Sequence, residues 1–169
     1  SSHRRQRQMC IRDSLYIFQR RIVFNKSGHP GAPKDYNLDN TEEVYIKTED
    51  NLKLLSWYHK GNNSLPLLVY FHGNSFHIGD RAYRIQKYIE KNWSVLLVSW
   101  RGFGGNEGNP TEKNLYKDAE AVLKWIKNNT EFKFKELVIY GESLGSGAAV
   151  EMGTKLSLIH ISEPTRREG

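Results

Sequence analysis

The sequence predicts an α/β fold in which an antiparallel hairpin leads into a parallel sheet with helices on both faces. Two β-prone runs, 44–48 and 52–58, flank the turn-forming pair Asp50-Asn51, and this arrangement indicates the hairpin. Short continuous apolar runs then alternate with segments of helical periodicity, which is typical of parallel strands joined by crossover helices. The hairpin at the start distinguishes this order from that of a plain dinucleotide-binding fold.

Three apolar runs have the pattern of strands buried on both faces: 67–71, 95–100 and 137–140. Apolar residues at helical spacing follow the first two runs: Ile78, Ala82, Ile85 and Ile89, then Leu115, Ala119, Val122 and Ile126. The second of these helices has candidate N-cap, first and third positions at Asn109, Pro110 and Glu112. The run 137–140 leads straight into Gly141 and a third helix beginning near Ser146.

The composition suits one globular domain with a sizeable core. The chain has 169 residues, of which 38% are hydrophobic and 26% charged. The single cysteine excludes an internal disulfide framework, and no Cys/His cluster has the spacing of metal ligands. No apolar run approaches the roughly 20 residues that span a bilayer. We therefore expect no metal and no cofactor.

Both ends of the chain resemble translated adapters of the kind used in transposon-based sequencing libraries. Such adapters can encode RRQRQMCIRDS at 4–14 and LSLIHISEPTR at 156–166. The codons that fit 156–161, reverse-complemented and read one base on, encode 9–14. We therefore expect residues 1–14 and 156–169 to be adapter-derived and the natural sequence to be a partial domain at 15–155. The alternative is a basic N-terminal arm and a natural C-terminal strand.

This assignment changes the meaning of the net charge of +6. Residues 1–14 carry +3 and residues 156–169 carry no net charge, so 15–155 keeps +3. The only cysteine, Cys10, also falls in the adapter-like part. The basic cluster at the N-terminus is then no indication of a nucleic-acid partner, and we expect none.

The motif Gly141-Glu142-Ser143-Leu144-Gly145 has the form G-x-S-x-G and lies between an expected strand and an expected helix. This context is the one a nucleophile elbow requires, because the sharp turn lifts the serine out of the sheet. Glycines on either side avoid side-chain clashes in so tight a turn. The pattern predicts Ser143 as a nucleophile. The alternative is a Gly/Ser-rich turn without catalysis.

A second element, His72-Gly73-Asn74-Ser75, follows the first apolar run. Acyl transfer needs two N–H donors directed at the developing oxyanion. One donor comes from the residue after the nucleophile, here Leu144, and the other from the loop after an earlier strand, here Asn74. We expect His72 to be structural, packed or hydrogen-bonded behind this loop. His77 lies close by at the start of a helix.

The segment Trp100–Gly108 is rich in glycine, and Gly102, Gly104 and Gly108 follow a strand as in a dinucleotide loop. The spacing fits poorly, because Glu107 stands where a glycine is usual. The turn is also too long to bring a pyrophosphate to a helix N-terminus. We interpret the segment as a crossover bordering the active site.

These three motifs, in this order and spacing, resemble the α/β-hydrolase superfamily, and most closely its bud-emergence-protein-like and serine-aminopeptidase-like branch. The resemblance covers about 18–155. It implies the N-terminal half of an α/β-hydrolase fold, with Ser143 as nucleophile and the backbone N–H groups of Asn74 and Leu144 as the oxyanion hole. Gly73, Gly141 and Gly145 support these motifs. The stretch 15–21 would be the end of an N-terminal membrane anchor in the parent protein.

The chain departs from this family after Ser143, where the acid and histidine of a triad should follow in that order. The downstream acids are Glu151, Glu163 and Glu168, and the only downstream histidine is His160. All but Glu151 lie in the adapter-like tail. We expect an incomplete serine hydrolase, inactive as given, with the run 137–140 left as an exposed edge strand.

The expected reaction is hydrolysis of an ester, thioester or peptide through an acyl-enzyme, with a small-molecule, acyl or peptidyl substrate. Two other functions stay open: a non-catalytic binding module of the same fold, and a nucleotide-binding doubly wound domain.

The adapter assignment makes a prediction about the DNA that encodes the two ends of the chain. We expect the codons for 4–14 and 156–166 to match adapter sequence base for base, and trimmed reads from the source genome to diverge at 15 and 155. Genomic reads that still encode both strings in a natural context would contradict the assignment.

Overall fold

The computed structural model describes residues 25–26, 28–156 and 160–163. Its main sheet has six strands in the order β2-β3-β6-β4-β7-β8. Their bounds are β2 (Thr41–Lys47), β3 (Lys53–His59), β4 (Leu67–Phe71), β6 (Ser94–Val98), β7 (Leu137–Glu142) and β8 (His160–Glu163). The pairs β2–β3 and β3–β6 are antiparallel, and the other three pairs are parallel. The predicted α/β fold, a hairpin leading into a parallel sheet, is confirmed.

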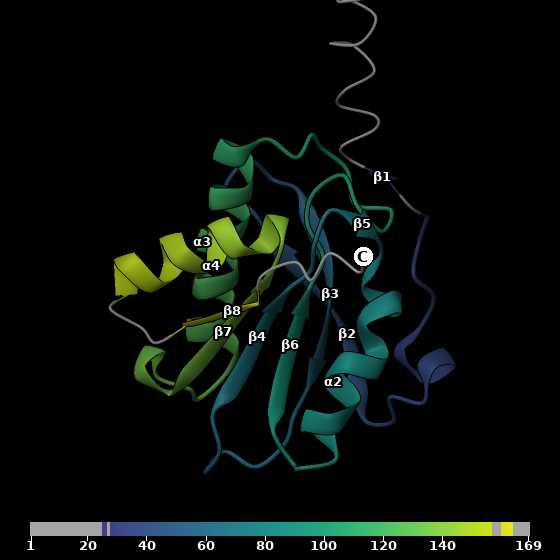
Figure 1. Cartoon of the computed structure of the whole chain (residues 1–169), viewed down its shortest axis with the longest axis vertical. Coiled ribbons are helices and arrows are strands. Elements are labelled where there is room, and N and C mark those ends of the chain that lie inside the picture. Colours follow the sequence, from purple (N-terminus) through teal and green to yellow (C-terminus); the bar gives the residue numbers. More distant parts are fainter. Residues whose placement is uncertain (1–24, 27, 157–159, 164–169) are drawn as a thin grey trace, which may run out of the picture.

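The helices are α2 (Ala82–Ile89), α3 (Glu112–Asn129) and α4 (Leu144–Leu156), with short 3₁₀ turns η1 (Pro33–Tyr36), η2 (Ile78–Arg81) and η3 (Phe134–Glu136). The helices α3 and α4 lie together on one side of the sheet and α2 lies on the other (Figure 1). A small parallel pair, β1 (Asn25–Lys26) with β5 (Ser75–Phe76), stands apart from the main sheet.

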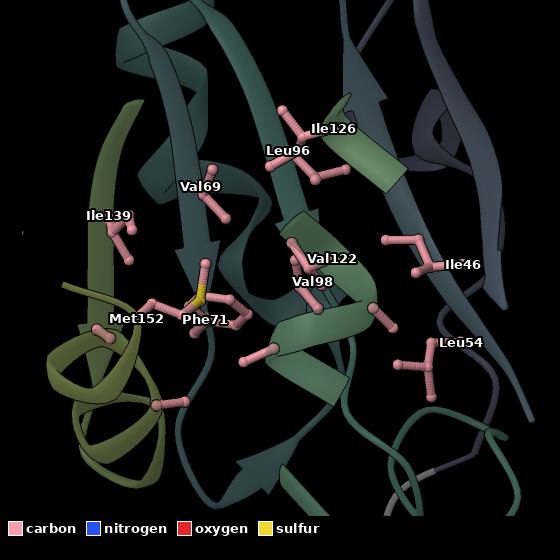
Figure 2. Packing of buried hydrophobic residues seen from close by; sticks show 14 of the residues in the cluster. Ile46, Leu54, Val69, Phe71, Leu96, Val98, Val122, Ile126, Ile139 and Met152 are labelled. Atoms are coloured by element: carbon pink, nitrogen blue, oxygen red, sulfur yellow. The ribbon is translucent and has the colours of Figure 1, made fainter. Parts of the chain in front are cut away.

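Strand β4 shows why the parallel strands are apolar throughout, because all five of its residues are buried. Leu67, Val69 and Phe71 face the core beneath α3 and α4, whereas Leu68 and Tyr70 face the core beneath α2. Figure 2 shows the first of these cores, with side chains from five strands and both helices. The two cores hold β4 at the centre of the sheet.

The predicted N-cap of α3 is wrong. The helix begins at Glu112, and Thr111 caps it by accepting a hydrogen bond from the Asn114 backbone at 3.3 Å. Pro110 therefore precedes the cap and is buried, where its ring packs against Gly102. A proline and a preceding asparagine fitted a helix start by pattern, but tertiary contact with the glycine-rich segment keeps them outside the helix.

The strand β7 is not an edge, contrary to the expectation from sequence. Strand β8 pairs with it in parallel, with His160 opposite Ile139 and Glu163 opposite Glu142. β8 lies within the part of the chain that resembles an adapter, and residues 1–14, the other such part, lie outside the described residues. The stretch 15–21, expected to end a membrane anchor, lies outside them too.

A buried ionic network ties the glycine-rich segment to the rest of the fold. The Arg101 guanidinium donates to Asp118 of α3 at 2.6 and 2.8 Å and to Asp50 of the hairpin turn at 2.7 and 3.1 Å. Arg101 is 2% exposed and Asp118 0%, whereas the Asp50 side chain is 36% exposed. The segment therefore contacts both the hairpin and α3 through one side chain.

The unequal burial of the two carboxylates predicts unequal costs of removing them. Asp118→Asn removes the buried negative charge that faces the Arg101 guanidinium and should lower the free energy of unfolding by about 3 kcal/mol. Asp50→Asn, the matched control, should cost about 1 kcal/mol or less because its site is open to solvent. Urea denaturation of the two variants measures both, and equal losses would contradict this ranking.

Candidate functional site

Ser143 is the single residue between a strand and a helix. β7 ends at Glu142, α4 begins at Leu144, and Ser143 has a left-handed backbone with φ of 49°. Left-handed backbone is uncommon for residues other than glycine and is concentrated at functional sites. The Ser143 side chain is exposed, and the Ser146 backbone N–H donates to the Ser143 carbonyl at 2.9 Å. The turn presents a hydroxyl to solvent at the carboxyl end of β7.

The two glycines of the motif permit a very close approach of α4 to the sheet. A Cβ on Gly141 would contact the Gly145 carbonyl and lie 2.7 Å from the Ser146 Cα. A Cβ on Gly145 would contact the Phe71 carbonyl and lie 2.9 Å from the Phe71 Cβ. Both glycines are therefore required by packing of backbone on backbone, which no side chain could enter.

The loop after β4 lies beside this turn. Phe71 pairs with Gly141 in the sheet, so His72, Gly73 and Asn74 continue next to the end of β7. A Cβ on Gly73 would lie 3.2 Å from the Glu142 carbonyl oxygen, which is a tight contact. The structure thus brings together the loop carrying Asn74 and the turn carrying Ser143. Leu144, at the first position of α4, has a backbone N–H that no intrahelical acceptor can reach.

His72 is fully buried and hydrogen-bonded on both ring nitrogens. Nδ1 lies 2.7 Å from the Gly73 carbonyl and therefore donates, while Nε2 accepts from the Trp100 backbone N–H at 3.4 Å. The Trp100 indole donates in turn to the His72 carbonyl at 2.9 Å. Burial, with the nearby Arg81 charge, lowers the pKa of His72 to about 4. The lowered pKa favours a neutral ring, and both of its nitrogens are engaged in hydrogen bonds that join the loop to Trp100.

Glu142 carries a carboxylate directly next to Ser143 in the chain. Arg81 donates to its two oxygens at 3.2 and 3.1 Å, and the Tyr70 hydroxyl donates to it at 2.9 Å. Burial alone would raise the pKa of Glu142, but the bonds and charge of Arg81 hold it below its ordinary value. Sequence reasoning missed this cluster, because its members are 61 and 72 residues apart.

Among the other residues in and after this loop, Phe76 has an unusual backbone conformation and Asn74 has an unpaired buried oxygen. Phe76 has a left-handed backbone with φ of 63° and is 52% exposed, a costly combination for a bulky residue. His77 Nδ1 lies 3.2 Å from an Asp80 carboxylate oxygen within η2. The Asn74 side-chain oxygen is buried without a hydrogen bond.

A separate hollow of about 300 Å³ lies between the hairpin and the glycine-rich segment. It is lined by polar and apolar residues that include Tyr45, Lys53 and Glu107, and by none of the predicted site residues. The interpretation of the glycine-rich segment as a crossover fits its observed connection from β6 to α3.

Two further findings concern the part of the chain that the structure describes. No three His, Cys, Asp or Glu side chains there are grouped so that they could hold a metal ion. None of its helices combines the length and hydropathy needed to cross a membrane.

Several curated proteins resemble this chain in sequence. An uncharacterized protein of Mycobacterium tuberculosis is 32% identical over 146 residues, which cover 83% of this chain and 51% of that protein. Protein bem46 of Schizosaccharomyces pombe is 28% identical over 83% of this chain and 50% of its own length. Lysophosphatidylserine lipase ABHD12 of Danio rerio is 28% identical over 73% and 37%. The chain spans about half the length of the first two of these relatives. No family model matches it.

Among solved structures, the esterase Pf2001 of Pyrococcus furiosus superposes with a TM-score of 0.63 and 27% identity, over 75% of this chain and 50% of that one. The fold is the N-terminal half of the α/β-hydrolase fold. The relatives and this structure support the α/β-hydrolase superfamily as the family of the chain.

The depressed pKa of His72 predicts a loss of stability in acid. Unfolded histidine binds a proton below its ordinary pKa of 6.5, whereas folded His72 does so only near 4. Stability from this group is therefore complete above pH 6.5 and should fall by up to about 3 kcal/mol as pH drops from 6.5 to 4. His72→Asn retains a donor for the Gly73 carbonyl without the titration, so its stability should fall less over that range. If urea denaturation shows that the free energy of unfolding falls equally in wild type and His72→Asn between pH 6.5 and 4, the prediction is wrong.

Proposed function

We propose that this chain carries the nucleophile half of a serine hydrolase that cleaves a carboxylic ester, thioester or amide through an acyl-enzyme. The observation that supports this most is the exposed, left-handed Ser143 between β7 and α4, with Gly73 of the neighbouring loop close to Glu142. Strain of this kind persists only where the surrounding structure enforces it. The hydrolase names of several relatives and of the Pyrococcus esterase favour the same reaction class.

In the proposed reaction the Ser143 hydroxyl oxygen attacks the substrate carbonyl and its proton passes to a histidine. The backbone N–H groups of Leu144 and Asn74 stabilise the oxyanion. Collapse of the tetrahedral intermediate forms a seryl ester. The histidine gives its proton to the leaving group, which departs as an alcohol, thiol or amine. Water then hydrolyses the seryl ester, which returns the proton to Ser143. The chain spans about half the length of its first relatives. We propose that the histidine and its orienting acid lie in the half that it does not cover, because His72 is occupied by the loop it holds.

The class of substrate is inferred from the names of the similar proteins and from the place where ligands bind in this fold. An ester is the substrate that best fits the lipase and esterase names among the similar proteins. A small molecule or acyl chain then meets Ser143 at the carboxyl edge of the sheet, where ligands bind in open α/β folds. The proposed function involves no nucleic-acid partner.

Two rival functions are distinguished by the same assays. A non-catalytic binding module is favoured by one observation, since no histidine or acid side chain among the described residues is hydrogen-bonded to the Ser143 hydroxyl. A nucleotide-binding domain would retain nucleotide through purification.

The test is covalent labelling by a fluorophosphonate, which reacts only with activated serines. In the protein expressed from the complete reading frame, we expect labelling that falls at least about 10³-fold in Ser143→Ala, since loss of a triad member costs several powers of ten. Ser64→Ala, which changes an exposed loop serine before β4, is the control and should label like wild type. Labelling that survives in Ser143→Ala, or that is absent from the wild type, rejects the proposal.

A further inference from the structure

The residue before Ser143 poses an electrostatic problem for the chemistry proposed above. A tetrahedral intermediate at Ser143 develops a full negative charge, and Glu142 already carries one on the adjacent residue. Like charges on adjacent residues repel each other, and burial of one of them, here the 21% exposed Glu142 side chain, reduces the screening by water. The carboxylate would therefore oppose the reaction unless a cation offset it.

Arg81 supplies that cation. Its Nε and Nη2 atoms donate to different oxygens of Glu142 at 3.2 and 3.1 Å, which is a bidentate contact. The Arg81 side chain is 7% exposed and that of Glu142 21%, so solvent screens the pair poorly. Tyr70 occupies a further acceptor site on the same carboxylate at 2.9 Å. The charge of Glu142 is therefore directed away from solvent and into this pair.

The position of Arg81 in the chain gives the contact a second effect. Arg81 ends η2, the turn that follows the loop of Gly73 and Asn74 after β5. Glu142 ends β7, immediately before the turn of Ser143 and Leu144. The bidentate ion pair thus connects the turn that follows the Asn74 loop with the strand that ends at the Ser143 turn.

We propose that Arg81 is a positioning residue for the reaction at Ser143, which offsets the charge of the Glu142 carboxylate on the residue before the serine. This inference rests on the proposed serine hydrolase function. It distinguishes Arg81 from the buried Arg101, whose partners lie in the hairpin turn and α3.

Substitutions at both ends of the pair separate this role from simple stabilisation. In the full-length protein, Arg81→Met leaves an unpaired carboxylate and should lower kcat for p-nitrophenyl ester about 10- to 100-fold, with KM changed less than about threefold. Glu142→Gln removes the repelling charge, so its kcat should stay within about threefold of wild type although its stability falls. Arg81→Lys keeps the cation and should retain most of the activity.

The double variant Arg81→Met with Glu142→Gln is the decisive comparison, because both charges are gone. Its kcat should return to within about threefold of Glu142→Gln, while urea denaturation shows that its stability does not recover to wild type. If Glu142→Gln loses as much activity as Arg81→Met, or if Arg81→Met is as active as wild type, the inference is wrong. Fluorophosphonate labelling of the wild type at Ser143 keeps this outcome distinct from failure of the proposed function.

Discussion

The structure depends on one close approach, the contact of the first turn of α4 with the ends of β4 and β7. Gly145 lies against the Phe71 carbonyl and Gly141 against Gly145 itself. Because backbone packs on backbone here, a side chain on either glycine would force α4 away from the two parallel strands. The left-handed Ser143 lies in this constrained turn, next to the loop after β4.

Polar groups reinforce this arrangement where apolar packing ends. His72 fills the space behind the loop and bonds to Gly73 and Trp100, while the Trp100 ring stacks on Phe71 at 4.7 Å between centroids. Arg81 secures the opposite side through Glu142. Buried polar groups of this kind are costly unless every bond is made, so each constrains its neighbours to one geometry. The proposed donors are therefore held by strands, a helix turn and satisfied side chains.

The sequence predicted the elements that rest on local pattern and missed those that rest on distant contact. The run 67–71 became β4 without an error at either end, because burial on both faces leaves a continuous apolar signature. The start of α3 was misplaced since Pro110 is retained by Gly102 rather than by the helix. No local signal links Arg81 with Glu142, because charged residues are common and their pairing arises only when β4 and β7 align. The structural role of His72 was predicted from its place in the loop, but its two bonds depend on Trp100.

The sheet order also bears on how the site is assembled. Strands β4 and β7 are neighbours in the sheet although β6 and two crossover helices lie between them in the chain, and Glu142 meets Arg81 across 61 residues of chain. Contacts of such long range cost closure entropy, and proteins in which they dominate fold slowly. A partly folded chain can contain the hairpin and α2 and still lack any defined surroundings for Ser143. The reactivity of this serine would then be a direct measure of the fully folded population, since no earlier species could display it.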